Sequence, residues 1–481
     1  MGTDGMRGHR QDAVARPYQT LAASFAAWKL FLLAIAIGSC VGDTYDTSGS
    51  LAVLGNHGHP PGFGANLVTR FASWDAIYFL TAARRGYRFE QEWAFGAPLA
   101  ITIRAIIRAL SHLGLVAQDP QLRLGDDHGP ALLEVLVGIF IANASHLLSV
   151  IVLYRLGLVV WRSNPQGPLL SLVAALLHVV SPAGLFLSAP YAESTCALLT
   201  FLGYLLYASS CTSETAASRD GYVVLAGLAF GIATSFRSNA ILNGIPFAWE
   251  VLQVLSTLAG RWTSSTTSAP LSRSDPQSTT PTTGDAVRRL LALGVGGVAV
   301  AAGTLVPQAV AYQRFCLGPS DADLPRRPWC DKLVPSIYTF VQRHYWDNGF
   351  LRYWTLSNIP LFLLAAPVLV IMVKSGIDYL GPPTAQKNSG SAGPGSTDGA
   401  SARLSTMVRS AAAAQAALAV LAALNHHVQI ITRISSGYPV WYWWVADKMV
   451  RGDMWGKRVV VFMVMYAGIQ GALFTSFLPP A

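Results

Sequence analysis

Long apolar stretches recur along the whole chain, and most are long enough to cross a lipid bilayer as a helix. A spanning helix needs about 20 mostly apolar residues. Only 12% of the 481 residues are charged, whereas soluble domains carry about 25%. We therefore predict an all-α polytopic membrane protein with roughly ten transmembrane helices, at residues 21–39, 131–161, 169–187, 191–208, 221–235, 241–258, 290–312, 359–373, 407–431 and 459–477.

Basic residues indicate which helix ends face the cytoplasm, because Lys and Arg are enriched in cytoplasmic loops. The net charge is +9, and residues 1–20 carry Arg7, Arg10 and Arg16. We expect 1–20 to be a cytoplasmic N-terminus and 21–39 to be the first transmembrane helix. A cleaved signal peptide is the alternative, but the apolar run is long and Gly-Ser-Cys at 38–40 is a poor cleavage site.

Composition divides the rest of the chain into apolar and polar parts. Residues 261–289 are rich in Ser, Thr and Pro, and residues 375–407 in Gly, Ser and Pro. Such stretches are typical of disordered loops, and their basic residues place both in the cytoplasm. The other parts are a luminal catalytic loop at 40–130, transmembrane helices at 131–260, helices at 290–374 flanking a luminal loop at 313–357, and C-terminal transmembrane helices at 408–481.

The first luminal loop contains two segments that predict helices lying in the membrane interface. Residues 74–85 are mainly aromatic and aliphatic, with one acidic residue, Asp75, near the start. Residues 99–116 place Arg104, Arg108 and His112 four residues apart, opposite Ile and Leu. This basic amphipathic pattern is typical of helices that lie flat on a membrane.

Asp75 is the main candidate for catalysis. It stands within Phe-Ala-Ser-Trp-Asp-Ala-Ile-Tyr-Phe-Leu at 71–80, and a charge at a membrane boundary is costly unless it has a function or a partner. A carboxylate there can act as a general base toward a sugar hydroxyl. Trp74 beside it can stack on a sugar or anchor the interface. In the alternative interpretation Asp75 only caps a helix.

Three further acids are candidates for substrate binding. Glu90 and Glu92 lie among arginines and aromatics, and either can bind sugar hydroxyls or assist Asp75. The alternative is a solvated turn with ordinary ion pairs. Glu193 follows a stretch with two prolines, and such breaks in spanning segments occur where the backbone lines a cavity. Glu193 therefore lines a cavity or follows a structural kink.

Two arginines are candidates for binding a lipid phosphate, because a guanidinium presents a planar fork of donors to phosphate oxygens. Arg237 lies between two predicted helices with Asn239, and Arg433 lies at a luminal helix end. The alternative is snorkelling toward the interface. Trp346 belongs to an aromatic segment at 342–358 that we expect to form a luminal interface helix over the cavity, and the Trp/Tyr cluster at 438–444 is expected in an aromatic belt.

Of the five cysteines, Cys316 and Cys330 fall in the second luminal region. An oxidising compartment favours a disulfide between them, and two free thiols are the alternative. Cys40, Cys196 and Cys211 are expected to be unpaired. No pair has metal-ligand spacing, so no metal site is predicted. The sequon at Asn143 lies inside a predicted span, where it is not accessible for glycosylation.

Several stretches in chain order together resemble the GPI mannosyltransferase 2 family, whose members act in the synthesis of the glycosylphosphatidylinositol (GPI) anchor. They are RFASWDAIYFL, RGYRFEQEWAF, SPAGLFLSAPYAES, FRSNAILNG, RRPWC, YWDNGFLRYW followed by NIPLFLLAAP, and QIITRI with PVWYWW. The resemblance extends from about residue 22 to the C-terminus and skips both linkers. The chain departs from the family pattern at 95–98, Phe-Gly-Ala-Pro, which weakens the case for Glu92 more than that for Asp75.

The resemblance implies a C-type membrane glycosyltransferase fold in the endoplasmic reticulum, with the active site on the luminal side. It implies an inverting transfer from dolichyl phosphate mannose, with no cofactor or metal, and a small accessory membrane subunit. The family's Trp-Asp pair falls on Trp74 and Asp75, and the acid of its Tyr-x-x-Glu region falls on Glu90.

The expected reaction adds the second mannose, α-1,6-linked, to the mannosyl-glucosaminyl-acyl-phosphatidylinositol precursor. Asp75 takes the proton of the acceptor hydroxyl, and Arg237 or Arg433 stabilises the departing phosphate. The alternatives are another dolichol-phosphate-sugar transferase, acting on an N-glycan precursor or a protein, and a polytopic lipid or solute transporter. Transporters often show inverted repeats, which this sequence does not display.

Overall fold

The computed structural model describes residues 13–54, 62–116, 131–265, 282–317, 327–381 and 399–478, without the side chains of 261–265. These residues form α-helices, short 3-10 helices and turns, with no strand among them. The prediction of an all-α chain is therefore confirmed.

Eight helical segments are long and apolar enough to cross a membrane. Seven are the helices α2 (Pro17–Ser39), α7 (Leu132–Val160), α9 (Glu193–Thr212), α12 (Thr283–Cys316), α14 (Ile359–Leu380), α15 (Gly399–Asn425) and α18 (Met454–Thr475). The eighth combines the 3-10 helix η3 (Ser238–Gly244) with α11 (Ile245–Ser265).

The predicted count of ten spanning helices is not confirmed. The predicted span at 169–187 is a shorter helix, α8 (Gly167–Val179), which ends before Pro182, and the 3-10 helix η2 (Gly184–Leu187) follows it. The predicted span at 221–235 is present as α10 (Ala216–Phe236), but its first turns carry Arg219 and Asp220, and it does not reach the apolarity of the others.

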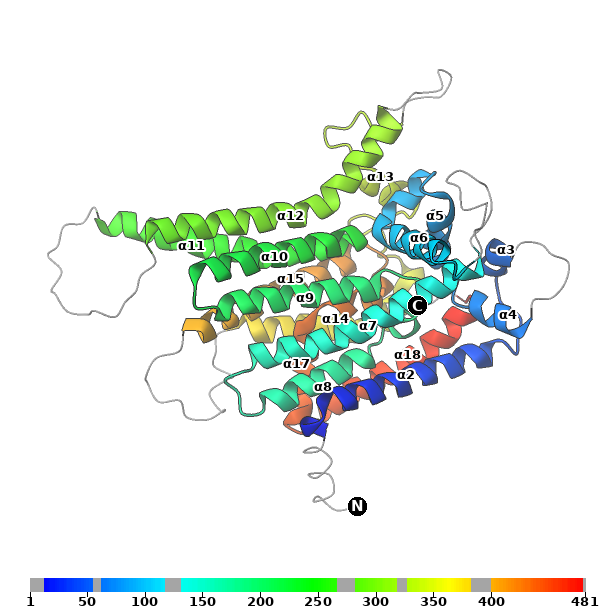
Figure 1. Cartoon of the computed structure of the whole chain (residues 1–481), viewed down its shortest axis with the longest axis horizontal. Helices are drawn as coiled ribbons and strands as arrows, with labels where there is room; N and C mark the ends of the chain where they lie inside the picture. Colours follow the sequence, from blue (N-terminus) through cyan, green and yellow to red (C-terminus); the bar gives the residue numbers. More distant parts are fainter. Residues whose placement is uncertain are drawn as a thin grey trace, which may run out of the picture.

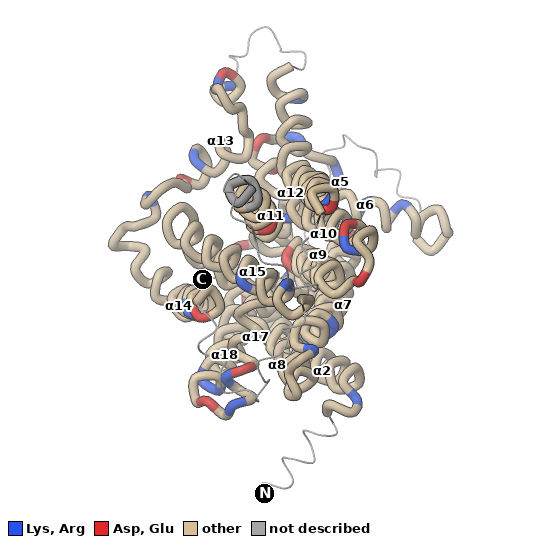
Figure 2. Tube along the Cα trace, turned by 90° about the vertical axis from the view of Figure 1, so that its left-hand side faces the viewer, with Lys and Arg blue, Asp and Glu red and all other residues tan. Residues whose placement is uncertain are grey.

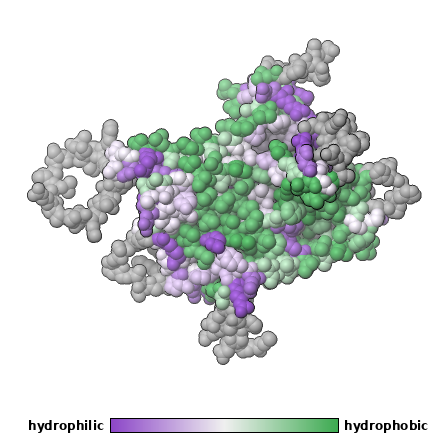
Figure 3. All heavy atoms as spheres, viewed as in Figure 1, coloured by the Kyte–Doolittle hydropathy of each residue, from purple (hydrophilic) through white to green (hydrophobic). Residues whose placement is uncertain are grey.

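The long helices run side by side, and the short helices gather at one end of the bundle (Figure 1). That end carries α3 (Ser48–Leu54), α4 (Phe63–Thr69), α5 (Ala76–Arg85), α6 (Ala97–His112) and α13 (Ile337–His344). Helices are thus present in both segments of the first loop predicted to be helical, as α5 and α6. The start of α2 and the turns α7–α8 and α9–α10 lie at the opposite end. Hydrophobic residues dominate the middle of the face in Figure 3.

The aromatic segment near the C-terminus differs from the prediction, because it is buried in the bundle and does not form a belt. Residues 431–450 form α16 (Ile431–Ile434), the 3-10 helix η7 (Ser435–Gly437) and α17 (Pro439–Val450). Tyr442 and Trp443 are fully buried, and α17 packs among α8, α15 and α18 (Figure 2). The rings fill space between helices, and Trp441 Nε1 donates to the Ser435 carbonyl at 3.0 Å.

The predicted luminal helix at 342–358 is also wrong. Helix α13 ends at His344. Asp347 and Leu351 adopt φ angles of 47° and 56°, a left-handed conformation that an α-helix of L-residues does not continue through.

Helices extend into both segments predicted as disordered loops, 261–289 and 375–407. α11 continues to Ser265, α12 begins at Thr283, α14 reaches Leu380 and α15 begins at Gly399. Thr282 caps α12 by accepting a hydrogen bond from the Asp285 amide at 3.1 Å. The inner parts of these loops, 266–281 and 382–398, lie outside the described residues.

A buried ion-pair group holds the start of α12 against its neighbours. Arg289 of α12 bonds to Glu250 of α11, with 2.7 Å between Nε and Oε1, and its Nη1 lies 3.3 Å from Asp220 Oδ1 of α10. The Arg289 side chain is 11% exposed. Arg289, whose charge predicted a cytoplasmic loop, thus forms ion pairs between helices.

Arg289→Ala should therefore lower the free energy of unfolding by about 3 kcal/mol, because it leaves Glu250 without its cation and removes one of the two arginines that pair with Asp220. Arg288→Ala is the matched control, since Arg288 also pairs with Asp220 but is 46% exposed, and exposed pairs contribute about 1 kcal/mol or less. Thermal unfolding of both purified variants measures the difference. Equal destabilisation by the two changes would contradict this role of Arg289.

Candidate functional site

A strained turn places Asp75 at the start of α5. Trp74 has a φ of 57°, which is unusual for a residue with a side chain. The Ser73 carbonyl accepts a hydrogen bond from Tyr191 Oη at 3.0 Å, and the Trp74 ring packs on Phe477 with 5.1 Å between centroids. Asp75 makes no side-chain capping bond to α5. The alternative in which it only caps this helix is therefore wrong.

The Asp75 carboxylate belongs to a group of four charged residues, which we call the acid–arginine cluster: Asp75, Glu193, Arg237 and Arg433. Arg433 Nη2 lies 3.0 Å from Asp75 Oδ2 and 2.8 Å from Glu193 Oε1. Arg237 Nη1 lies 3.0 Å from the same Glu193 oxygen. Glu193 begins α9, Arg237 follows α10 and Arg433 lies in α16. Four distant segments of the chain thus meet at this point.

Burial differs strongly within the acid–arginine cluster. The Glu193 side chain is 1% exposed, Arg433 13% and Arg237 15%, whereas Asp75 is 33% exposed. Two acids and two bases together carry no net charge, and pairing offsets part of the cost of removing charges from water. Asp75 is therefore the member of the cluster most accessible to a substrate.

Aromatic rings hold the Arg433 guanidinium in place. Its Cζ lies 4.4 Å from the centre of the Phe186 ring and 4.9 Å from that of Tyr191, which are cation–π distances. Burial by itself lowers the pKa of Arg433, but the charges of Glu193 and Asp75 outweigh this and raise the pKa above its ordinary value. Arg433 therefore remains charged.

Three aromatic rings in contact connect α5 with the loop after α13. Tyr78 stacks on Phe95 with 4.8 Å between centroids, and Phe95 packs on Trp346 at 5.4 Å. Burial raises the pKa of Tyr78, and the negative charge of Asp75 raises it further. Tyr78 is therefore a neutral phenol beside the carboxylate. Trp346 is linked to Tyr78 through the Phe95 ring.

Glu90 and Glu92 lie apart from the acid–arginine cluster, and protein groups bind both carboxylates. Glu90 accepts from Trp329 Nε1 at 2.7 Å and pairs with Arg327 at 3.3 Å. Glu92 pairs with Arg85 at 2.5 Å and accepts from the Arg88 amide at 2.6 Å. The structure thus gives these two acids contacts that hold loops together.

The disulfide between Cys316 and Cys330 holds the same loop, with 5.7 Å between their Cα atoms. It ties the end of α12 to the segment that carries Trp329, the partner of Glu90. The Asn239 carbonyl accepts from Tyr438 Oη at 2.9 Å, which joins η3 to the start of α17. Among the residues the structure describes, no group of three or more His, Cys, Asp or Glu is placed to hold a metal ion.

Sequence reasoning did not identify three residues that shape the site. Phe186 and Tyr191 contact the Arg433 guanidinium, and Lys29 of α2 donates to the Leu187 carbonyl at 3.0 Å and to Ser188 Oγ at 2.7 Å. Lys29 thus fixes the turn that precedes Glu193. A signal for it was available, because Lys29 is the single charge in the first predicted span, and such charges usually have a partner inside the protein.

Comparison with solved structures gives the crystal structure of the Archaeoglobus fulgidus oligosaccharyltransferase in its apo form. The match covers 94% of this chain and 56% of that chain, at 13% identity and a TM-score of 0.42.

Sequence relatives are much closer. The chain is 54% identical to GPI mannosyltransferase 2 of Chaetomium globosum over 490 residues, covering 97% of this chain and 96% of that protein. It is 43% identical to GPI mannosyltransferase 2 of Gibberella zeae, covering 98% and 99%. A family model described as Mannosyltransferase (PIG-V) matches residues 30–265 and 277–481. The chain therefore belongs to the PIG-V family of mannosyltransferases.

Proposed function

We propose that this mannosyltransferase adds the second mannose of the GPI anchor, in an α-1,6 linkage, in the endoplasmic reticulum. The donor is dolichyl phosphate mannose, and the acceptor is the mannosyl-glucosaminyl-acyl-phosphatidylinositol precursor. The relatives' name and their full-length coverage support the pathway. The observation that carries the chemistry is the acid–arginine cluster, in which the partly exposed Asp75 carboxylate pairs with Arg433 while Glu193 pairs with both Arg433 and Arg237.

In the proposed reaction Asp75 accepts the proton of the acceptor's 6-hydroxyl as that oxygen bonds to the anomeric carbon of mannose. The bond from this carbon to the phosphate oxygen breaks on the opposite face, so a β-linked donor gives an α-linked product. Dolichyl phosphate leaves with the bonding electrons, and Asp75 later releases its proton to water. Holding the two substrates in line can contribute about 7–11 kcal/mol.

Arg237 is the better candidate for the leaving phosphate. Arg433 already faces two carboxylates and two rings. Arg237 is held by Nη1 alone among the described contacts, so Nη2 and Nε can donate to phosphate oxygens. Glu193 keeps both guanidinium groups in position.

The proposed orientation places the end with the short helices in the lumen. The Cys316–Cys330 disulfide lies at that end, and disulfides persist in oxidising compartments. The start of α2 and the basic linkers then face the cytoplasm, as the distribution of Lys and Arg favours. A small accessory membrane subunit remains a prediction from the family resemblance.

Asp75→Asn should reduce mannose transfer by about 10²–10⁴-fold, because the amide cannot accept the proton. The assay follows labelled mannose from dolichyl phosphate mannose to the lipid acceptor in microsomes, with protein amount and thermal stability checked in parallel. Asp347→Asn is the control, since Asp347 lies in the same region with its side chain 80% exposed. Near-normal transfer by Asp75→Asn would remove Asp75 from catalysis.

Arg237→Gln should raise the KM for dolichyl phosphate mannose by roughly 10–100-fold, the effect of losing a hydrogen bond to a charged group. Arg237→Lys keeps the charge without the planar fork, so we expect an intermediate KM. If Arg237→Gln lowers thermal stability but leaves the KM for the donor unchanged, Arg237 only supports Glu193.

Expression of this chain in a strain that lacks the second GPI mannosyl step should restore growth and remove the lipid intermediate with one mannose. This experiment tests which lipid is the acceptor. Persistence of that intermediate, together with mannose transfer to another lipid or to protein, would identify a different dolichol-dependent transferase. The Asp75→Asn variant serves as the inactive control.

A further inference from the structure

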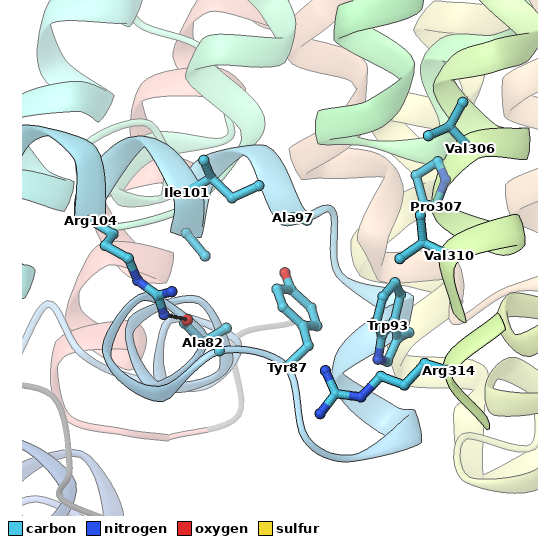
Figure 4. A pocket seen from close by; sticks show the side chains of 12 residues that line it. Ala82, Tyr87, Trp93, Ala97, Ile101, Arg104, Val306, Pro307, Val310 and Arg314 are labelled. Carbon is cyan, nitrogen blue, oxygen red and sulfur yellow. Dashed lines mark hydrogen bonds between the residues drawn. The ribbon is translucent and has the colours of Figure 1, made fainter. Parts of the chain in front are cut away.

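A groove of about 370 Å³ lies between α6, the end of α5 and the outer half of α12 (Figure 4). Its walls are mainly apolar, with Ile101 on one side and Val306 and Val310 on the other. These three side chains are between 48% and 62% exposed. Since α12 is apolar enough to span the membrane, we expect these exposed side chains to face the hydrocarbon of the bilayer.

The described residues place positive charge at this groove without an acid that pairs with it. Arg104 and Arg314 line it, and none of its twelve lining residues is acidic. Arg108 follows Arg104 by one turn of α6. No ion pair joins any of the three to a carboxylate of the described residues. Burial lowers the pKa of Arg104, and the charge of Arg108 lowers it further, as expected for cations that lack an anion.

Arg104 is held in a fixed position beside the groove. Its Nε donates to the Ala83 carbonyl at 2.7 Å and its Nη2 to the Ala82 carbonyl at 3.0 Å, at the last turn of α5 (Figure 4). Arg314 is exposed on the opposite wall, near the end of α12. An anion between them would join α5 and α6 to α12.

We propose that this groove binds one anionic phospholipid of the bilayer, with its phosphate at Arg314, its negative charge also offsetting that of Arg104, and an acyl chain along Ile101, Val306 and Val310. Such a lipid matches the groove, because arginine pairs with the phosphate of the headgroup and the apolar walls bury the acyl chain. No member of the acid–arginine cluster lines the groove. The lipid is therefore a structural component that steadies α5, whose first residue follows Asp75, and it is distinct from the substrates.

The test is native mass spectrometry of the full-length protein, purified in mild detergent and exposed to nanodiscs of phosphatidylcholine with or without phosphatidylserine. The wild-type chain should retain one phosphatidylserine. Arg314→Gln should lower this retention about fivefold, the contribution of one arginine near a lipid headgroup. Val310→Trp places a larger side chain in the apolar part of the groove and should lower phosphatidylserine retention without changing the charge. Arg343→Gln, an exposed arginine on α13, is the control and should retain the lipid.

Two results would overturn the proposal. One is equal retention of phosphatidylserine by the wild-type, Arg314→Gln and Val310→Trp chains. The other is an isoprenoid phosphate in place of the phospholipid in protein purified from membranes, which would make the groove part of the donor site. Because Asp75→Asn should keep the phospholipid while losing transfer, the two proposals fail separately.

Discussion

The contact of Arg433 with Asp75 and Glu193 is the interaction on which the rest of the site depends. One guanidinium joins the first residue of α9 to the turn before α5, and it contacts the Phe186 and Tyr191 rings. Removing Arg433 would leave Asp75 without its ion-pair partner, and removing Glu193 would leave Arg237 without one. Leaving a buried charge without its partner is far more costly than losing an exposed pair. The position of the Asp75 carboxylate is therefore tied to the packing of helices more than 100 residues away in sequence.

Interrupted helices make this convergence possible. α8 ends at Val179, the 3-10 helix η2 follows, and α9 begins at Glu193. The segment between α8 and α9 is therefore a break in α-helical structure within the bundle. Lys29 and Ser194 both donate to the Leu187 carbonyl in that segment. Backbone groups freed by such a break need partners inside a membrane protein, and these side chains supply them. The same break positions Glu193 beside Arg237.

The sequence predicted the fold class and the helices α5 and α6, because each has a local signal: apolar length or helical periodicity. It named all four members of the acid–arginine cluster but not their contacts, since pairing across hundreds of residues leaves no local pattern. Trp443 was expected in a belt and is in the core, because a buried aromatic and an interfacial one look alike in a single sequence. Arg289 was assigned to a loop because its partners, Glu250 and Asp220, become visible only when the helices pack.

The last helix closes onto the first. The Tyr45 amide donates to the Ser476 carbonyl at 3.0 Å, Arg70 donates to the Thr475 carbonyl at 3.3 Å, and Phe477 packs on Trp74. The turn that presents Asp75 is thus supported by residues about 400 positions further along the chain. A cut in the chain between α17 and α18 would leave all four members of the acid–arginine cluster in one piece and still remove this support.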